Sequence, residues 1–395
     1  MSVLTTTAGS RPARAIARRS GHRVELLADW KQAVAAWGVV DPSTPFQHPQ
    51  WLERWYGAFS DAPGIVPLIA VISDAVTGER TALLPLILRR HDGIRIVEFA
   101  DLDLTDYNAP LLGPAAPRDP RSARLLWRDL LAALRKVPGG ADLIRLRKVP
   151  ADLGGRPNPL AMLREAGPCA LNGNLIVIGE DFDAWRFTLE RTTRKELERS
   201  WRVFTRDPAA GFTLAKDAAD ALNILAATEV QQGARMQSLG LAFMLNEERC
   251  AGFYRSLVRD GVAGGYAVAS ALTAGDEIVA TLIGIRTGSR YVMIRISNAG
   301  GHWSKCSPGR LIIERTMAAL HRDGVREFDF SIGNYAYKRR FGVTRTALAD
   351  VSAALSWRGL PYALRDRAAR ALRRHPRVMA HLKRALGKPP SREED

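Results

Sequence analysis

A stretch near the C-terminal end, FDFSIGNYAYKRRFG over residues 328–342, places an acid, a turn and a Tyr-Lys pair close together. The segment REFDFSI alternates like a strand, so its three apolar side chains share one face and Asp329 lies on the other. The Gly-Asn turn that follows brings Tyr337 and Lys338 within reach of the strand end. A carboxylate and a phenol so placed can take a proton from an acceptor and give one to a leaving group. We therefore take Asp329, Tyr337 and Lys338 as candidate catalytic residues. The alternative is structural: Asp329 accepts loop N–H bonds, Tyr337 packs in the core and Lys338 faces water.

A second candidate site precedes this stretch. In RISNAGGHWSKCSPGRLIIERTMAAL, a strand ends in a loop and Ser307, Pro308 and Gly309 lead into a helix. Backbone N–H groups and the helix dipole at such an N-terminus suit a pyrophosphate, with Lys305 and Arg310 as counter-charges. In the alternative, Ser307 caps the helix and Pro308 occupies its first turn without any ligand.

Two further polar groups are candidates for binding substrate. Asp106 and Tyr107 follow a strand in the first half of the chain, where capping of the loop is the alternative role. Arg191 and Arg194 lie at near-helical spacing on a helix after residue 181, where a solvated basic face is the alternative. Asp106 and Tyr107 would form one wall of an acceptor cleft, and Arg191 and Arg194 would recognise an anionic donor or acceptor between the halves.

The cysteines and histidines predict no metal site. The three cysteines are odd in number, far apart and outside any metal-ligand spacing, and the histidines form no HxxxH or HxH pair. Cys306 lies beside a Gly-containing loop, but no histidine partner for a nucleophile is recognisable.

The elements that position these residues alternate between helical and extended patterns. Three strands are expected over residues 66–74, 80–93 and 94–102, and one long basic helix over residues 181–205. The order helix, helix, three antiparallel strands, helix, strand occurs in both halves, which indicates two copies of one α/β unit.

The predicted boundaries are a disordered basic tail over 1–23, a first unit over 24–165, a second unit over 166–356 and a basic helical tail over 357–395. The net charge is +16, and most of it lies in the two tails.

The N-terminal tail faintly resembles an organellar transit peptide, and disorder is the simpler interpretation. The C-terminal tail has apolar residues at helical spacing between arginines and lysines. It packs on the body as a helix, or it contacts anionic lipid headgroups or RNA phosphates. No apolar run approaches the ~18 to 20 residues of a spanning helix, which predicts a soluble chain.

Seven segments resemble, in this order, the cellulose-biosynthesis-type branch of the GNAT acyltransferase superfamily. They are PFQHPQWLERWY, LLPLILRR, DYNAPLL, RTTRKELERSWR, EIVATLIGIRTGSRYV, SPGRLIIE and FDFSIGNYAYKRRFG. The resemblance covers roughly residues 24 to 350, and its most specific parts are the SPGR loop and the final block. The general GNAT pattern of Arg or Gln followed by two glycines is absent. The branch is similar in architecture to the Fem-type peptidoglycan aminoacyltransferases.

The resemblance implies an α/β (α+β) chain of two tandem GNAT-like units, each a largely antiparallel sheet flanked by helices. It implies an N- or O-acyltransferase with an acyl-CoA as co-substrate and no metal. The acceptor would be an amine or hydroxyl on a sugar, lipid or small metabolite, as in bacterial envelope polysaccharide biosynthesis. The donor is expected on the second unit, at Lys305, Ser307, Gly309 and Arg310.

Two other functions stay open at this point. One is a Fem-like transferase that uses aminoacyl-tRNA, and the other is a non-catalytic scaffold at the membrane surface. The expected location is cytoplasmic, with peripheral contact at the inner face of an anionic membrane through the C-terminal helix.

Overall fold

The fold was obtained as a computed structural model that describes residues 21–38, 44–333 and 335–375. Residues 1–20 of the predicted N-terminal tail and residues 376–395 of the predicted C-terminal tail lie outside these ranges. The turn residue Asn334 also lies outside them.

Eleven strands of the described chain form one mixed sheet. In spatial order they are β10 (Ala210–Leu214), β11 (Ala267–Ala274), β12 (Glu277–Thr287), β13 (Arg290–Asn298), β14 (Glu327–Asp329), β9 (Ala166–Val177), β15 (Thr344–Ala354), β8 (Leu143–Pro150), β6 (Ile94–Phe99), β5 (Leu86–His91) and β2 (Ile65–Pro67). A separate sheet has the order β1 (His22–Leu27), β3 (Ile69–Asp74), β4 (Arg80–Leu84) and β7 (Leu111–Leu112). The mixed sheets with flanking helices confirm the predicted α/β class.

Helices cover both faces of the sheets. They are α1 (Trp30–Trp37), α2 (Pro49–Phe59), α3 (Pro120–Leu134), α4 (Phe182–Thr188), α5 (Arg191–Phe204), α6 (Ala218–Ser238), α7 (Glu248–Gly261), α8 (Pro308–Arg322), α9 (Ala336–Arg340) and α10 (Leu360–Arg373), with 3-10 turns η1 (Pro45–Gln47), η2 (Met244–Asn246), η3 (Gly301–Cys306) and η4 (Trp357–Gly359). In the second half, α6 and α7 share a core with one face of β11 to β13, while α5 and α8 share a core with the other face.

The two halves repeat one arrangement. In the first half, β6 is antiparallel to β5 and, after α3, parallel to β8. In the second half, β13 is antiparallel to β12 and, after α8, parallel to β14. Each crossover buries the apolar stripe of its helix against the sheet, which explains why both segments carry a helical repeat of leucine and isoleucine.

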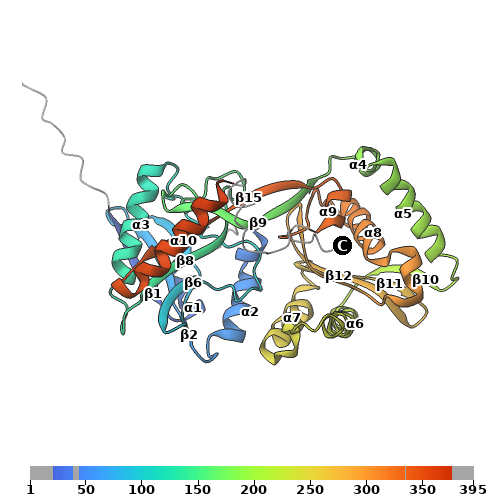
Figure 1. Cartoon of the computed structure of the whole chain (residues 1–395), viewed down its shortest axis with the longest axis horizontal. Coiled ribbons are helices and arrows are strands. Elements are labelled where there is room, and N and C mark those ends of the chain that lie inside the picture. The colour runs from blue at the N-terminus through green and yellow to red at the C-terminus, as the bar shows by residue number, and fades with distance from the viewer. Residues whose placement is uncertain (1–20, 39–43, 334, 376–395) are drawn as a thin grey trace, which may run out of the picture.

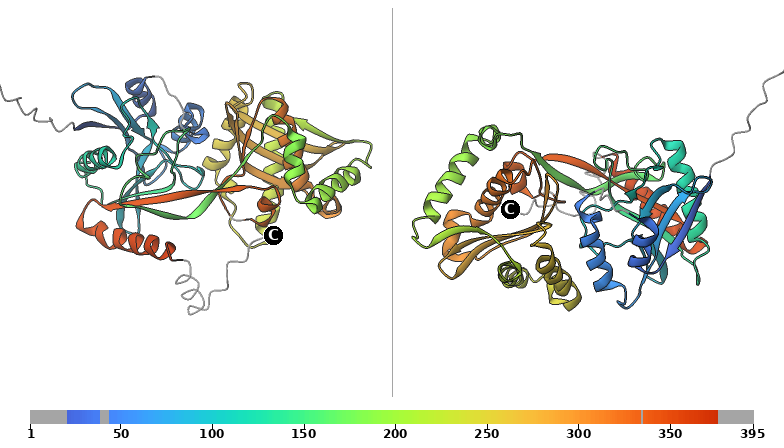
Figure 2. Two further views of the ribbon diagram at one scale, coloured as in Figure 1. Left: turned by 90° about the horizontal axis from the view of Figure 1, so that it is seen from above. Right: turned by 180° about the vertical axis from the view of Figure 1, so that it is seen from behind.

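Two long strands join the halves. The C-terminal end of β9 pairs with β14, and the C-terminal end of β15 pairs with β8. Between these ends β9 and β15 pair with each other, so they run from one half to the other (Figures 1 and 2). The helix α10 then returns to the first half, beside β8, β9 and β15 (Figure 1). The predicted unit boundary at residue 165 precedes β9 and stays a prediction.

Two expected elements are divided in the structure. The segments 66–74 and 80–93 each form two strands in different sheets, and Pro85 lies at the break between β4 and β5. Proline lacks the N–H that a continuous ladder needs, so the chain changes sheets there. The expected helix over 181–205 is two helices, because Leu189 adopts an extended backbone and buries its side chain near Gly342.

Candidate functional site

The two neighbouring strands β13 and β14 separate within the second half. They pair in parallel only from Arg290 to Val292, and β13 continues without β14 as far as Asn298. The register of β13 against β12 also shifts between Met293 and Arg295. A β-bulge of this kind inserts one residue and re-aims the side chains beside it. Beyond Val292 the edge of β13 therefore has no ladder partner in β14, and this unpaired stretch between the two strands is called the gap below.

The N-terminus of α8 lies beside the last residue of β13, because Gly309 of the helix is close to Asn298. Ser307 has a left-handed backbone, with φ of 46°, and its side chain makes no capping hydrogen bond to the helix. Instead, Ser307 Oγ accepts a hydrogen bond of 3.0 Å from Arg310. The alternative in which the Ser307 hydroxyl simply caps the helix is therefore not what the structure shows. An N-terminus without a side-chain cap retains its capacity to bind an anion.

The other predicted donor residues surround this helix end. Lys305 is exposed on η3. Arg310 also pairs with Glu196 of α5 at 2.6 Å, so its charge is partly compensated. A Cβ added at Gly309 would meet Asn298 at 3.5 Å, an ordinary contact, so this position has room for a small side chain. The structure thus gathers Lys305, Ser307, Gly309 and Arg310 at one place.

The cysteine beside this loop is not an activated nucleophile. The Cys306 side chain is buried, its thiol donates to the Trp303 carbonyl at 2.9 Å, and burial raises the pKa of the thiol. A thiol with a raised pKa is a poor nucleophile at neutral pH.

The junction between the halves holds a second group of predicted residues. Asp329 is 1% exposed and accepts hydrogen bonds of 2.7 Å from the Tyr107 hydroxyl and from the Ser331 N–H. It also forms an ion pair with Arg290 of β13. Because three donors engage its oxygens, Asp329 holds the two halves together at this point, and its predicted role as a proton acceptor stays a prediction.

Asp106 lies beside this contact. Its carboxylate accepts a hydrogen bond from the Ser331 hydroxyl, and burial raises its pKa to about 6. The backbone of Ser331 is left-handed, with φ of 62°, and its carbonyl accepts a hydrogen bond of 2.7 Å from Asn174. The turn after β14 is thus fixed against the loop that carries Asp106.

That loop is itself fixed by buried polar contacts. Lys148 pairs with Asp101 at 2.7 Å and donates to the Thr105 carbonyl at 2.6 Å. Trp51 donates to the Thr105 hydroxyl at 3.1 Å, and Gln47 donates to the Tyr107 carbonyl at 3.1 Å. Paired buried charges and satisfied carbonyls give the loop one conformation, so the position of Asp106 is set before any ligand binds.

Lys338 on α9 completes the group, whereas its neighbour Tyr337 packs against the core that α5 and α8 share with the sheet. The Lys338 ammonium is buried, donates to the Ile332 carbonyl at 2.6 Å and has a pKa lowered by burial to about 8. The nearby carboxylates of Asp106 and Asp329 oppose this lowering. Burial raises the pKa of Tyr337 to about 12, and its ring stacks on Tyr335 at 6.0 Å. Asp106, Tyr107, Asp329 and Lys338 therefore belong to one cluster.

Arg191 and Arg194 are not part of that cluster. They lie at the start of α5, which packs on η3 and α8 on the side of the second half away from the first (Figure 1). The Arg194 guanidinium lies over the Phe187 ring at 5.1 Å. Their predicted role in binding substrate stays a prediction, and the structure does not bring them to Asp106 and Tyr107.

Sequence analysis missed three residues of the junction, namely Arg290, Ser331 and Asn174. All three come from strands or turns that meet only in the folded sheet, and they form no local motif. The one available signal was the polar face of REFDFSI, on which Ser331 accompanies Asp329.

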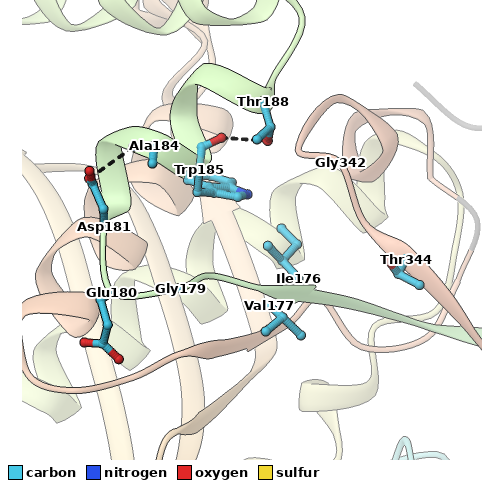
Figure 3. Close-up of a pocket in the computed structure, with 10 residues that line it drawn as sticks. All are labelled: Ile176, Val177, Gly179, Glu180, Asp181, Ala184, Trp185, Thr188, Gly342 and Thr344. Carbon is cyan, nitrogen blue, oxygen red and sulfur yellow. Dashed lines mark hydrogen bonds between the residues drawn. The ribbon is translucent and has the colours of Figure 1, made fainter.

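A pocket of about 650 Å³ lies elsewhere in the second half (Figure 3). It is formed by the end of β9, by α4 with Asp181 at its N-terminus, and by Gly342 and Thr344. It contains none of the predicted site residues, so the volume alone does not identify it as the reaction site.

The described residues contain no group of three or more His, Cys, Asp or Glu side chains placed to hold a metal ion. No helix among them combines the length and hydropathy needed to cross a membrane.

Comparison with known proteins supports the GNAT resemblance. Residues 191–339 match the acetyltransferase (GNAT) domain family. Among solved structures, FemX is similar with a TM-score of 0.57 at 10% identity, covering 86% of this chain and 99% of that chain. A conserved protein of unknown function from Bacteroides thetaiotaomicron VPI-5482 has a TM-score of 0.53 at 12% identity, covering 85% and 100%. The search of curated proteins found no match. Residues 191–339 are therefore similar to a GNAT acetyltransferase domain and the fold of the chain is similar to that of FemX, while the cellulose-biosynthesis-type branch stays a prediction.

Proposed function

We propose that this protein transfers an acyl group from an acyl-CoA to an amine or hydroxyl of a sugar, lipid or small metabolite. The observation that carries the proposal is the separation of β13 from β14 in front of the uncapped N-terminus of α8. A gap between strands exposes backbone groups to an extended ligand, and the helix end suits its phosphates.

The donor residues fit a phosphate-bearing ligand. The helix end offers backbone N–H groups and a positive dipole, Lys305 is exposed beside it, and Gly309 leaves the approach open. Arg310 is tethered by Glu196 and Ser307, which orients its guanidinium toward this end of the helix. When bound, acyl-CoA would supply the activated thioester.

The acceptor is proposed to bind at the junction of the halves, with Asp106 as the group that takes its proton. A carboxylate whose pKa is raised to about 6 is largely ionised at neutral pH and more basic than an ordinary carboxylate. As the acceptor nitrogen or oxygen bonds to the acyl carbon and the carbon–sulfur bond breaks, Tyr337 gives its proton to the departing thiolate. Lys338 and Asp329 hold the surrounding turn through the Ile332 carbonyl and the Ser331 N–H.

Calorimetric titration of the full chain with acetyl-CoA and longer acyl-CoAs tests the donor site. We expect saturable binding, weakened at least about tenfold in Gly309→Asp, because a carboxylate would face the phosphates. Gly309→Ala is the matched control and should bind nearly as the wild type, since its Cβ has room. Saturable binding of no acyl-CoA would end this proposal.

We also propose that the protein docks on anionic membrane through α10 and η4. Trp357, Leu360 and Leu364 are 83%, 51% and 55% exposed, and their spacing places them on one helical stripe. Arg365 and Arg367 are exposed beside them. An exposed tryptophan and leucines beside arginines are typical of a helix that lies in the membrane interface.

The rest of α10 is fixed to the protein, so this stripe is presented outward. Arg145 pairs with Asp366 at 2.7 Å, and Arg373 pairs with Asp350 at 3.0 Å. Arg370 is buried and donates to the Ser352 hydroxyl at 2.8 Å. These contacts account for one face of the helix and leave the stripe of Trp357, Leu360 and Leu364 on the other.

Flotation with lipid vesicles tests the docking surface. The full chain should float with vesicles that contain phosphatidylglycerol and much less with phosphatidylcholine alone. Replacing Leu360 and Leu364 together by serine should weaken binding roughly tenfold or more, because two leucines leave the lipid. The matched control replaces Leu239 and Leu241, which are 57% and 56% exposed. Equal flotation of both double variants would contradict the surface, as would tRNA competing fully for the same binding.

A further inference from the structure

The charge of Arg295 on β13 lacks a carboxylate partner. Within the described residues no Asp or Glu forms an ion pair with it, in contrast to Arg290 on the same strand, which pairs with Asp329. Its guanidinium instead donates to the Gln232 amide oxygen at 3.3 Å and to the Met244 sulfur at 3.2 Å, and its buried Nε has no hydrogen-bond partner in the part of the chain that the structure describes. A thioether is a weak acceptor, so a half-buried positive charge is left poorly compensated.

The β-bulge explains why Arg295 faces this direction. Ile294 packs in the core shared with α6 and α7, and Arg295 also contacts residues of that side, whereas the next residue, Ile296, packs against the opposite core. Two successive residues on one face require the extra residue at the register shift. The chain thus departs from regular alternation at the position that carries the cation.

The guanidinium is held in a defined place. It lies over the ring of Tyr254 on α7, 4.5 Å from the centroid. Gln232, which accepts from Arg295, also donates to the Ile296 carbonyl at 2.9 Å, so the amide is itself oriented. A stacked and hydrogen-bonded arginine loses little freedom when an anion binds, which is the arrangement that favours recognition.

Its surroundings are those of the proposed acceptor site. Arg295 lies on the part of β13 beyond its ladder with β14, and the Tyr254 ring beneath its guanidinium belongs to the same core cluster as Tyr107, the neighbour of Asp106. The cation is therefore on the side of the gap from which the first half contributes Asp106.

We propose that Arg295 binds an anionic group of the acceptor, a carboxylate or a phosphate, beside the amine or hydroxyl that reacts. The assignment to an acceptor rests on the proposed acyl transfer, but the anion site can be tested without it. Arg295 is thereby a specificity residue that selects anionic acceptors over neutral ones.

Equilibrium binding of inorganic phosphate and of acetate to the full chain, at constant ionic strength, tests the site. The measurements use Gly309→Asp as the background, so that phosphate does not bind at α8. We expect saturable binding of at least one probe, and the stronger probe identifies the class of anion. Arg295→Gln should weaken that binding roughly tenfold or more, and Arg295→Lys should retain part of it. Arg202→Gln, an exposed position on α5 with the same change of charge, is the control and should bind as the background does.

Calorimetry with acetyl-CoA on Arg295→Gln in the otherwise wild-type chain separates this inference from the proposed function. Wild-type binding of acetyl-CoA, together with loss of anion binding, supports both the anion site and the proposed acyl transfer. Loss of the anion in a chain that binds no acyl-CoA supports the anion site and ends the acyl transfer. Anion binding equal in Arg295→Gln and the background, or saturable binding of neither probe, overturns the inference.

Discussion

The Tyr107 hydroxyl of the first half donates a hydrogen bond of 2.7 Å to the Asp329 carboxylate of the second half. Both side chains are buried, and the Arg290 guanidinium, which pairs with Asp329, lies 5.9 Å from the centre of the Tyr107 ring. The two halves are therefore connected beside the proposed acceptor site by a charge-assisted hydrogen bond as well as by β9 and β15.

Tyr107→Phe should destabilise the protein. The change leaves a buried carboxylate with one donor fewer, which typically costs about 1.5–3 kcal/mol for a hydrogen bond to a charged group. Urea denaturation measures the free energy of unfolding. Tyr291→Phe is the matched control, because that tyrosine is also buried and its hydroxyl has no hydrogen-bond partner among the described residues. Similar decreases in the free energy of unfolding in both variants would show that the hydrogen bond to Asp329 makes no specific contribution.

Asp106→Asn should lower the turnover rate without lowering the free energy of unfolding at pH 8. The folded-state pKa of Asp106 lies above its ordinary value, so the folded chain binds more protons than the unfolded chain between about pH 4 and 6. The contribution of this carboxyl to stability therefore falls as the pH rises through that window. At pH 8 the neutral amide should not lower the free energy of unfolding.

The turnover rate, unlike the stability contribution of Asp106, should increase as the pH rises. The rate of the wild type should rise with pH around a midpoint near 6, as Asp106 ionises, and then level off. Asp106→Asn should lower turnover by ~10²- to 10⁴-fold and remove this rise, with donor affinity intact. A variant that keeps the rise in rate near pH 6 would assign the proton to another group.

Tyr337→Phe should lower turnover more than donor affinity. The ring and its packing remain, while the proton donor is lost, and loss of a general acid typically costs ~10²- to 10⁴-fold. Tyr335→Phe, the neighbour that stacks on Tyr337 and is 42% exposed, is the control. Steady-state kinetics with calorimetry distinguish the effects, and an unchanged turnover in Tyr337→Phe would remove the residue from the mechanism.

Local patterns predicted most of the elements. The helical repeat of RLLWRDLLAALRKV and the alternation of REFDFSI depend on neighbours in sequence, and both elements form as predicted, although β14 stops at Asp329. The break in the helix over 181–205 was not predictable in this way, because it depends on the burial of Leu189 near Gly342, which is far away in the chain.

The residues of the candidate site also differ in whether neighbours in sequence could predict them. Lys305, Ser307, Gly309 and Arg310 are neighbours in sequence, and the structure gathers them at one helix end. The partners of Asp329 were not predictable, because Tyr107 is 222 residues away and Arg290 reaches Asp329 only through the parallel pairing of β13 and β14. The interpretation of Asp329 with Tyr337 as a pair had only their closeness in sequence to support it.

The most direct measurement is a crystal structure of the full chain with acetyl-CoA. We expect the pyrophosphate at the N-terminus of α8, beside Ser307 and Gly309, and the thioester in the gap between β13 and β14, on the side of Asp106. Acetyl-CoA bound instead in the pocket formed by α4 and the end of β9, with the gap between β13 and β14 empty, would contradict this expectation.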